Sequence, residues 1–250
     1  MENPSIATLR KVQAQVRQSG VSVTTTSLED YDLGGVDCPI CQNRGYLMYT
    51  KDGYDFSREC DCMAKRRSMR RIRKSGMEDM LARYTFDAYE TPDKSRENIK
   101  AAAERFCDAD TGWFYISGRS GSGKTHICTA VCSRLIERGK ETYYMRWRDE
   151  SRKLKALVNS DEIEEPLEML KRVPVLYIDD FFKGGHTEAD ERIAFEILNS
   201  RYNDTKLRTI FSTELGIEDV LDIDEALGGR IKERSRGFLI TAPQENWRLR

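Results

Sequence analysis

The stretch WFYISGRSGSGKT, from Trp113 to Thr125, joins a short apolar run to a glycine-rich turn that ends in Lys-Thr. The pattern G-x-x-x-x-G-K-[ST] is met by Gly118, Gly123, Lys124 and Thr125. In this pattern the backbone N–H groups curl around phosphates. A chance serine-glycine turn is the alternative, but the match lies between a strand pattern and a helical pattern, as the motif requires. The stretch therefore predicts a phosphate-binding loop.

Each polar group of the loop has an expected role toward ATP. Lys124 would reach the β and γ phosphates, and the Thr125 hydroxyl would bind Mg²⁺. The helix that follows directs the positive end of its dipole at the phosphates. The residues expected to bind ATP here are Gly118, Arg119, Ser120, Gly121, Ser122, Gly123, Lys124 and Thr125.

The composition is that of an ordinary soluble chain. Its 250 residues are 33% charged with a net charge of −1, so no global bias argues for nucleic acid. No run of about 18 apolar residues and no secretory signal occur, and we expect a cytoplasmic protein without a membrane partner. Four of the seven cysteines lie in close pairs, which in a reducing compartment favours a metal site over disulfides.

The first predicted region, residues 1–37, contains a short amphipathic helix and a linker. Ile6, Leu9, Val12 and Val16 form one apolar stripe before Gly20 ends the helix. Packing on a neighbouring domain and docking to a partner are both compatible with such a helix.

The segment CPICQNRGYLMYTKDGYDFSRECDC, residues 38–62, has the cysteine spacing of a metal site. The first pair has zinc-knuckle spacing, and the second, one residue tighter than usual, returns after a hairpin expected to turn at Asp52-Gly53. Four thiolates would close a tetrahedral, structural Zn²⁺ site and stabilise a segment with little apolar material. Four unligated surface cysteines are the alternative. The predicted zinc ligands are Cys38, Cys41, Cys60 and Cys62.

The run KRRSMRRIRK, residues 65–74, carries seven positive charges and no negative one. A solvated helix face and a contact with nucleic-acid phosphates or an acidic partner are equally compatible with it. We expect the helix to end near Ser75-Gly76, which closes a zinc module of residues 38–76 and leaves residues 77–250 for the nucleotide domain. The aromatic residues of LARYTFDAYETPD, residues 81–93, could cover an adenine ring or pack against the sheet.

A second apolar strand, VPVLYIDDFF, delivers two carboxylates to the edge of the predicted sheet. Asp179 would hold Mg²⁺ through water, together with Thr125. Asp180 could polarise an attacking water, which predicts hydrolysis of ATP. Strand-end polar residues without a function are the alternative for each aspartate taken alone. Helical patterns separate the predicted strands, which favours an α/β fold with a five-stranded parallel sheet covered on both faces. These strands are residues 113–117, 141–147, 173–182, 207–213 and 237–242.

Seven stretches together resemble the AAA+ replicative-helicase loaders of bacteria and phages, of the DnaC and DnaI type, and less closely the transposition helper ATPases of the IstB type. They are GRSGSGKT, LYIDDF, FEILNSRY, TIFSTEL, DIDEALGGRIKER, CPIC and CDC. The resemblance covers residues 38–250 and implies strand order 5-1-4-3-2 and ATP-dependent self-association on a hexameric helicase. Only 16 residues follow Arg234, too few for the helical lid of a typical AAA+ protein.

The resemblance also implies roles for residues late in the chain. A polar sensor ends the fourth strand, here Thr213 or Glu214. An arginine that completes a neighbouring subunit's site would be Arg230 or Arg234, neither of which has an obvious partner in its own chain, and Arg248 would touch the nucleotide in cis. Asp180 stands where many AAA+ enzymes carry glutamate, which suggests slow hydrolysis.

Two function classes remain open, with ATP, Mg²⁺ and Zn²⁺ as the expected cofactors in both. A helicase loader would bind ATP and single-stranded DNA, with residues 1 to about 75 on the helicase and the ATPase domain on DNA. A transposase-partner ATPase would assemble on duplex DNA. The cysteine module favours the loader, because a separate small head can grip a partner. If Asp180 does not support hydrolysis, a third interpretation remains, a nucleotide-binding protein with a regulatory role only.

Overall fold

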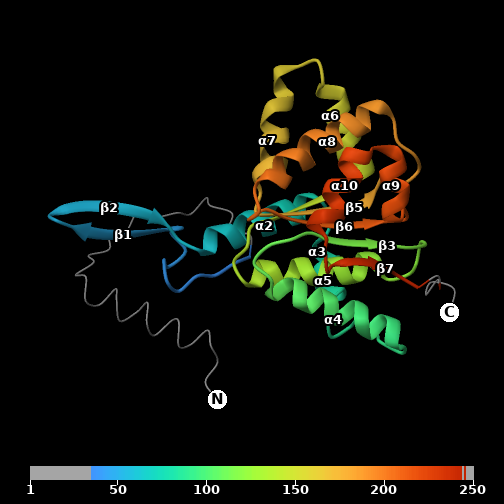
Figure 1. Cartoon of the computed structure of the whole chain (residues 1–250). Coiled ribbons are helices and arrows are strands. Elements are labelled where there is room, and N and C mark those ends of the chain that lie inside the picture. The colour runs from blue at the N-terminus through green and yellow to red at the C-terminus, as the bar shows by residue number, and fades with distance from the viewer. Residues whose placement is uncertain (1–34, 244, 246–250) are drawn as a thin grey trace. The chain divides into compact units, whose positions relative to one another are not determined.

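The computed structural model describes residues 35–243 and Glu245 (Figure 1). The predicted amino-terminal helix and Arg248 therefore lie outside the described residues. The chain divides into two compact units after Arg70, within helix α2 (Cys62–Lys74). In the part that the structure describes, no helix is both long and apolar enough to span a bilayer.

The small unit is built on an antiparallel hairpin of β1 (Tyr46–Lys51) and β2 (Tyr54–Glu59). The predicted turn at Asp52-Gly53 is confirmed: both residues have positive φ, 52° and 81°, as a two-residue hairpin turn of type I′ requires. Leu47 is partly buried and the other hairpin side chains are exposed. The hairpin therefore has no apolar core of its own.

The large unit contains a five-stranded parallel sheet with strand order β4-β5-β6-β3-β7. Numbered along the domain, this is the order 5-1-4-3-2, so the predicted topology is confirmed. The inner strands β5 and β6 are buried almost throughout, and burial on both faces explains the continuous apolar run at the start of β5. The strands are β3 (Phe114–Ser117), β4 (Thr142–Arg146), β5 (Val175–Phe181), β6 (Arg208–Thr213) and β7 (Leu239–Thr241).

Helices cover both faces of this sheet, as predicted (Figure 1). On one face lie α3 (Glu78–Arg83), α4 (Lys94–Asp108) and α5 (Lys124–Glu137). On the other face lie α6 (Trp147–Leu157), the 3-10 turn η1 (Asp161–Ile163), α7 (Glu164–Arg172), α8 (Glu188–Asn203), α9 (Ile217–Ile223) and α10 (Glu225–Arg234).

A fully buried arginine fastens α8 to the sheet. The Arg201 side chain donates from Nε to Thr209 Oγ1 at 3.0 Å. Its other nitrogens donate to the main-chain oxygens of Leu170, Val173 and Arg208 at 3.0, 2.8 and 2.7 Å. Burial lowers the pKa of Arg201 to about 9. The buried guanidinium thus donates to oxygen atoms of the interior, where a polar group without a partner is costly.

Candidate functional site

The loop between β3 and α5 has the backbone that its glycines allow. Gly118, Gly121 and Gly123 have φ of 148°, 79° and 89°, values that other residues adopt only with strain. A Cβ on Gly118 would lie 3.0 Å from the Cβ of Ala242, so the loop also packs closely on the end of β7. Gly123 is the N-cap of α5, so the loop leads directly into the positive end of the helix dipole.

Lys124 is folded over this loop. Its Nζ donates to the carbonyl oxygens of Gly118 at 2.7 Å and Arg119 at 2.8 Å. The side chain is buried, and burial lowers the pKa of its ammonium. An incoming phosphate would offer this ammonium charged oxygens in place of two neutral carbonyls, which is the stronger hydrogen bond.

The two residues predicted to hold Mg²⁺ lie side by side. Thr125 Oγ1 is 3.3 Å from Asp179 Oδ1, because β5 ends beside the start of α5. The buried Asp179 carboxylate also accepts hydrogen bonds from Tyr144 and Tyr177, both at 2.8 Å, and from Ser212. Burial and the carboxylate charge raise the pKa of both tyrosines, so their hydroxyls stay protonated and donate. A carboxylate held in this way beside a hydroxyl fits Mg²⁺, which keeps several of its own waters.

Sequence reasoning missed Tyr144 and Ser212 as site residues. Tyr144 lies on β4 and Ser212 on β6, the two neighbours of β5 in the sheet. Ser212 Oγ also accepts from the backbone N–H of Asp180 at 3.2 Å. For Ser212 the available signal was its position in a predicted strand, directly before the sensor candidate Thr213.

The two sensor candidates occupy different places. Thr213 is buried, donates to Phe181 O at 2.7 Å and accepts from Leu215 N at 3.1 Å, so its hydroxyl is engaged by the main chain. Glu214 Oε1 lies 3.2 Å from Lys183 Nζ. Glu214 is therefore the candidate that belongs to the charged group around the loop.

Asp180, the predicted catalytic base, has a strained backbone and a charged partner. Its φ is 54°, in the left-handed region that few residues with a side chain adopt, and strained backbone of this kind clusters at active sites. Both carboxylate oxygens lie 3.3 Å from Lys183 Nζ. The two carboxylates outweigh burial and raise the pKa of Lys183. Lys183 was not anticipated from the sequence.

Two adjoining pockets lie over the loop. The first, of about 200 Å³, is lined by Tyr84, Ser120, Gly121, Gly123, Lys124, Thr125, His126, Asp180 and Lys183. The second, of about 250 Å³, is lined by Ala88, Tyr89, Glu90, Arg96, Ser122, Gly123 and His126. Gly123 and His126 line both, so the two pockets adjoin at the start of α5.

The second pocket has features that suit the nucleoside part of a nucleotide. Tyr89 Oη and Ser122 Oγ are buried and have no hydrogen-bond partner within the described structure, and such groups call for a ligand or water. The His126 ring stacks on Tyr84 at 4.9 Å and meets the edge of Tyr89 at 5.2 Å. Burial lowers the pKa of His126, which favours a neutral ring. The residues present therefore fit ATP.

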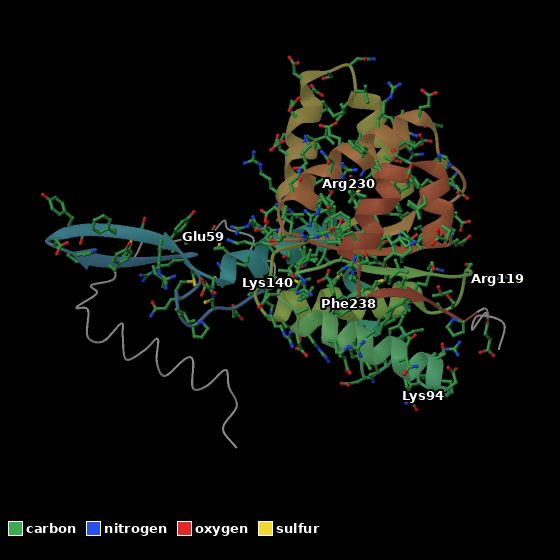
Figure 2. The ribbon with its side chains drawn as sticks, in the orientation of Figure 1. Glu59, Lys94, Arg119, Lys140, Arg230 and Phe238 are labelled. Atoms are coloured by element: carbon green, nitrogen blue, oxygen red, sulfur yellow. The ribbon has the colours of Figure 1, made fainter. Side chains whose placement is uncertain are left out.

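The arginines expected to act on a neighbouring subunit do have partners in their own chain, so that premise is wrong. Arg230 donates to Ala226 O at 2.8 Å and lies over the ring of Phe195 at 5.0 Å, among the helices (Figure 2). Arg234 donates to Thr205 O at 3.1 Å and lies over Trp113 at 5.7 Å. Neither lines the two pockets over the loop. Their role in trans stays a prediction.

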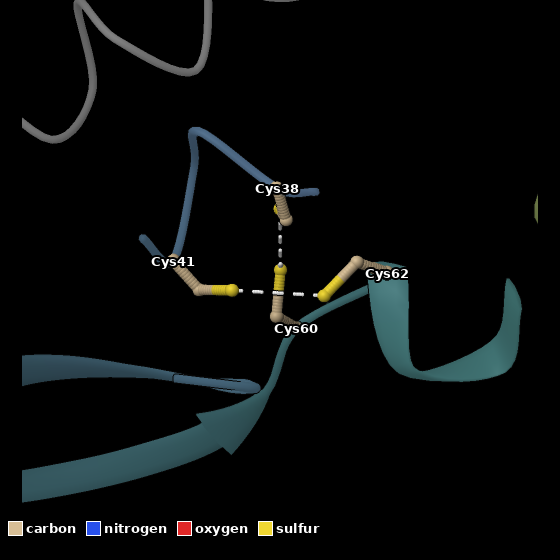
Figure 3. A group of neighbouring side chains, drawn as sticks. All are labelled: Cys38, Cys41, Cys60 and Cys62. Carbon is tan, nitrogen blue, oxygen red and sulfur yellow. Dashed lines mark hydrogen bonds between the residues drawn. The ribbon is translucent and has the colours of Figure 1, made fainter. Parts of the chain in front are cut away.

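The four predicted zinc ligands converge in the small unit (Figure 3). Their sulfurs all lie within 4.8 Å of one another, with Cys38–Cys60 at 3.8 Å and Cys41–Cys62 at 3.6 Å. Zn–S bonds of about 2.3 Å in a tetrahedron place sulfurs about 3.8 Å apart. Gly45 N also donates to Cys41 Sγ at 3.3 Å, a bond that stabilises a thiolate. The donor set fits a structural zinc ion.

The basic run of residues 65–74 is neither wholly a solvated face nor wholly a partner surface. Arg66 is fully buried and donates to the side chain of Asn43 at 2.7 Å and to Val36 O at 3.2 Å. Arg71 pairs with Glu141 at 2.5 Å. These two arginines support the structure, which a charge count alone does not reveal.

Comparisons with known proteins agree with this geometry. Residues 55–231 match the family described as IstB-like ATP binding protein. The uncharacterized protein YqaM of Bacillus subtilis (strain 168) is 32% identical over 205 residues, 76% of this chain and 64% of YqaM. The replicative helicase loader DnaC of Escherichia coli (strain K12) is 27% identical over 173 residues, 67% of this chain and 69% of DnaC.

A solved structure shares the fold of the large unit. The crystal structure of DnaI superimposes with a TM-score of 0.54 at 21% identity, covering 67% of this chain and 92% of that one. The phosphate loop, the parallel sheet and the family match all indicate an ATP-binding protein of one family. The chain belongs to the IstB-like ATP-binding proteins, a family related to the DnaC and DnaI helicase loaders.

Proposed function

We propose that this chain is an ATP-hydrolysing loader of a hexameric replicative DNA helicase that acts in the cytoplasm. The observation that carries the proposal is the similarity to DnaC over 173 residues. The nucleotide site supports it, because Lys124 lies over the phosphate loop and Thr125 lies beside Asp179. The four-cysteine unit supports it as well, since it adds a small head to the ATPase domain.

In the proposed cycle the loop N–H groups and Lys124 bind the phosphates, and the pocket at Tyr89 binds the nucleoside. Thr125 and Asp179 would hold Mg²⁺, which when bound offsets the charge that develops on the phosphates. Asp180 orients and polarises the attacking water. Its side chain is one methylene shorter than glutamate, and we expect hydrolysis to be slow.

The small unit supplies the partner surface in this proposal. Side chains stand out from both faces of the β1–β2 hairpin (Figure 2), and its large apolar ones are exposed where no core needs them. By the strand register, Tyr49, Tyr54 and Phe56 share one face, and Tyr46 and Met48 lie on the other. Exposed apolar surface is characteristic of protein interaction sites. We assign the helicase contact to this hairpin and contact with single-stranded DNA to the ATPase domain. The exposed residues are Tyr46, Met48, Tyr49, Tyr54 and Phe56.

The experiment for this function measures binding of the whole chain to the helicase and to labelled single-stranded and duplex oligonucleotides, with and without ATP. We expect helicase binding that Tyr54→Ser with Phe56→Ser abolishes, and ATP-dependent binding of single strands that the same variant keeps. Binding to duplex DNA with recruitment of a transposase, and none to the helicase, would replace the loader by the alternative function, a transposase-partner ATPase.

Self-association through the ATP sites is part of the proposal. Arginine suits a site shared between subunits, because its planar fork spreads positive charge over the γ-phosphate oxygens. Arg230→Ala or Arg234→Ala should bind ATP and hydrolyse it poorly, and mixing either with Lys124→Ala should restore some activity. No recovery at any mixing ratio would mean that each site is complete within one chain.

A further inference from the structure

Lys183 holds both carboxylates for which a catalytic or sensor role is expected. Its Nζ lies 3.3 Å from each oxygen of Asp180 and 3.2 Å from Glu214 Oε1. Lys183 also lines the phosphate pocket beside Lys124 and Thr125. Lys183 has no role in the ATP hydrolysis proposed above.

Lys183 is paired with carboxylates before any nucleotide arrives. Lys124, Lys183 and Asp180 line the pocket, Asp180 pairs with Lys183 there, and Glu214 pairs with Lys183 beside it. A γ-phosphate adds negative charge next to Asp180 and so competes with that carboxylate for the Lys183 ammonium. ADP has no γ-phosphate and would leave the two ion pairs intact.

The ion pairs of Lys183 can be exchanged at little cost. The side chains of Lys183, Asp180 and Glu214 are 40%, 33% and 40% exposed, and water-exposed pairs of this kind contribute little. A terminal phosphate carries more negative charge than a carboxylate, on three acceptor oxygens, so it competes with Asp180 and Glu214 for this ammonium. A lysine also carries its charge on a flexible four-carbon stem.

The main chain around Lys183 lets the side chain move while the strand end stays in place. Phe182 is buried and its ring lies 5.3 Å from that of Trp147, which anchors the residue before the lysine. Lys183 N donates to Asp180 O at 3.0 Å. Gly184 and Gly185 follow with positive φ and open space around them.

We propose that Lys183 distinguishes ATP from ADP: Asp180 and Glu214 hold it in the empty site, and it transfers to the γ-phosphate when ATP binds. The transfer frees Asp180 to polarise the attacking water. This inference rests on the proposed binding of ATP in this pocket. It makes Lys183 a second phosphate-binding lysine beside Lys124.

The test compares dissociation constants for ADP and for a non-hydrolysable ATP analogue, in the presence of Mg²⁺, by calorimetry on the full chain. We expect Lys183→Ala to weaken binding of the analogue about tenfold, the loss of one charge-assisted contact, and to leave ADP binding unchanged. Lys183→Arg should keep most of the preference for the analogue, because the charge is retained.

Lys171→Ala is the matched control. Lys171 also bridges two carboxylates, Glu168 three residues before it at 3.4 Å and Glu196 at 2.7 Å, but it lies on α7 and does not line the pocket. Removing it should change neither dissociation constant. Equal losses in the two alanine variants would mean that a bridging lysine affects the fold rather than the ligand.

A double-mutant cycle tests the exchange itself. Asp180→Asn removes the competing carboxylate, so it should tighten binding of the analogue more in the wild-type background than in Lys183→Ala. An equal gain in affinity for the analogue in both backgrounds would overturn the proposal. So would an unchanged preference for ATP over ADP in Lys183→Ala together with faster hydrolysis, which would leave Lys183 as a restraint on Asp180. A wild-type chain that binds neither nucleotide would instead contradict the proposed function, and with it this inference.

Discussion

The nucleotide domain and the small cysteine unit differ in what stabilises each of them internally. The nucleotide domain buries a large apolar cluster that includes Trp113, Leu176 and Phe211. In the small unit the corresponding cluster is Cys38, Cys41 and Cys60, with Leu47 and Cys62 packed against it. The first region folds by removing apolar surface from water. The second has little such surface to bury, and we propose that a metal ion held by its four cysteines supplies the missing stability.

Zinc removal should give the largest difference between the two regions. Cys60→Ser should abolish metal binding and unfold the small unit, since structural zinc contributes about 10 kcal/mol or more to such segments. The nucleotide domain should keep its thermal transition and its affinity for ATP. Elemental analysis and limited proteolysis of the purified chain would show both effects.

Cys107→Ser is the control for this experiment, because Cys107 is a buried cysteine of α4 outside the quartet. It should retain one zinc per chain. A wild-type chain that is free of metal after purification without chelator, yet resists protease at residues 38–62, would contradict the division into a metal-dependent and a core-dependent region.

Loss of the buried arginine should affect only the nucleotide domain. Arg201→Met leaves the carbonyl groups of Leu170, Val173 and Arg208 without their donor, and we expect a loss of about 3 kcal/mol in the free energy of unfolding. Arg192→Met on the same helix removes an exposed arginine and should cost less than about 0.5 kcal/mol. Denaturant unfolding that shows equal losses for the two variants would refute the structural role of Arg201.

The hairpin aromatics should have the smallest effect on stability. Tyr54 is 72% exposed, so Tyr54→Ser removes almost no buried surface and should change the unfolding free energy by less than about 0.5 kcal/mol. The zinc content should stay at one per chain. A marked loss of zinc or stability would show that the hairpin contributes a core, against the comparison drawn above.

Local patterns predicted the features that local geometry determines. The phosphate loop, the turn at Asp52-Gly53 and the four-cysteine cluster each follow from residue types at fixed spacing. The strand order came from the resemblance to helicase loaders, and Asp179 was found because it ends a continuous apolar run. Predicting these features requires little information about distant parts of the chain.

Contacts between distant segments escaped prediction. Lys183 meets Glu214 across 31 positions, and Tyr144 meets Asp179 across 35. Buried and solvated charges also look alike in a sequence: Arg201 lies inside a helix pattern and Arg66 inside a basic run, yet both are fully buried. Only the packing of the elements separates them from exposed arginines.

The central claim is that the loop and the end of β5 form one site in which binding and hydrolysis of ATP rest on different residues. The most direct measurement determines ATP affinity and steady-state hydrolysis for the wild type, Lys124→Ala and Asp180→Asn in parallel. We predict that Lys124→Ala loses binding, because the ammonium that neutralises the β and γ phosphates is gone, and that Asp180→Asn binds ATP but hydrolyses it poorly. Hydrolysis by Asp180→Asn at the wild-type rate would contradict this account and transfer the role of base to Glu214.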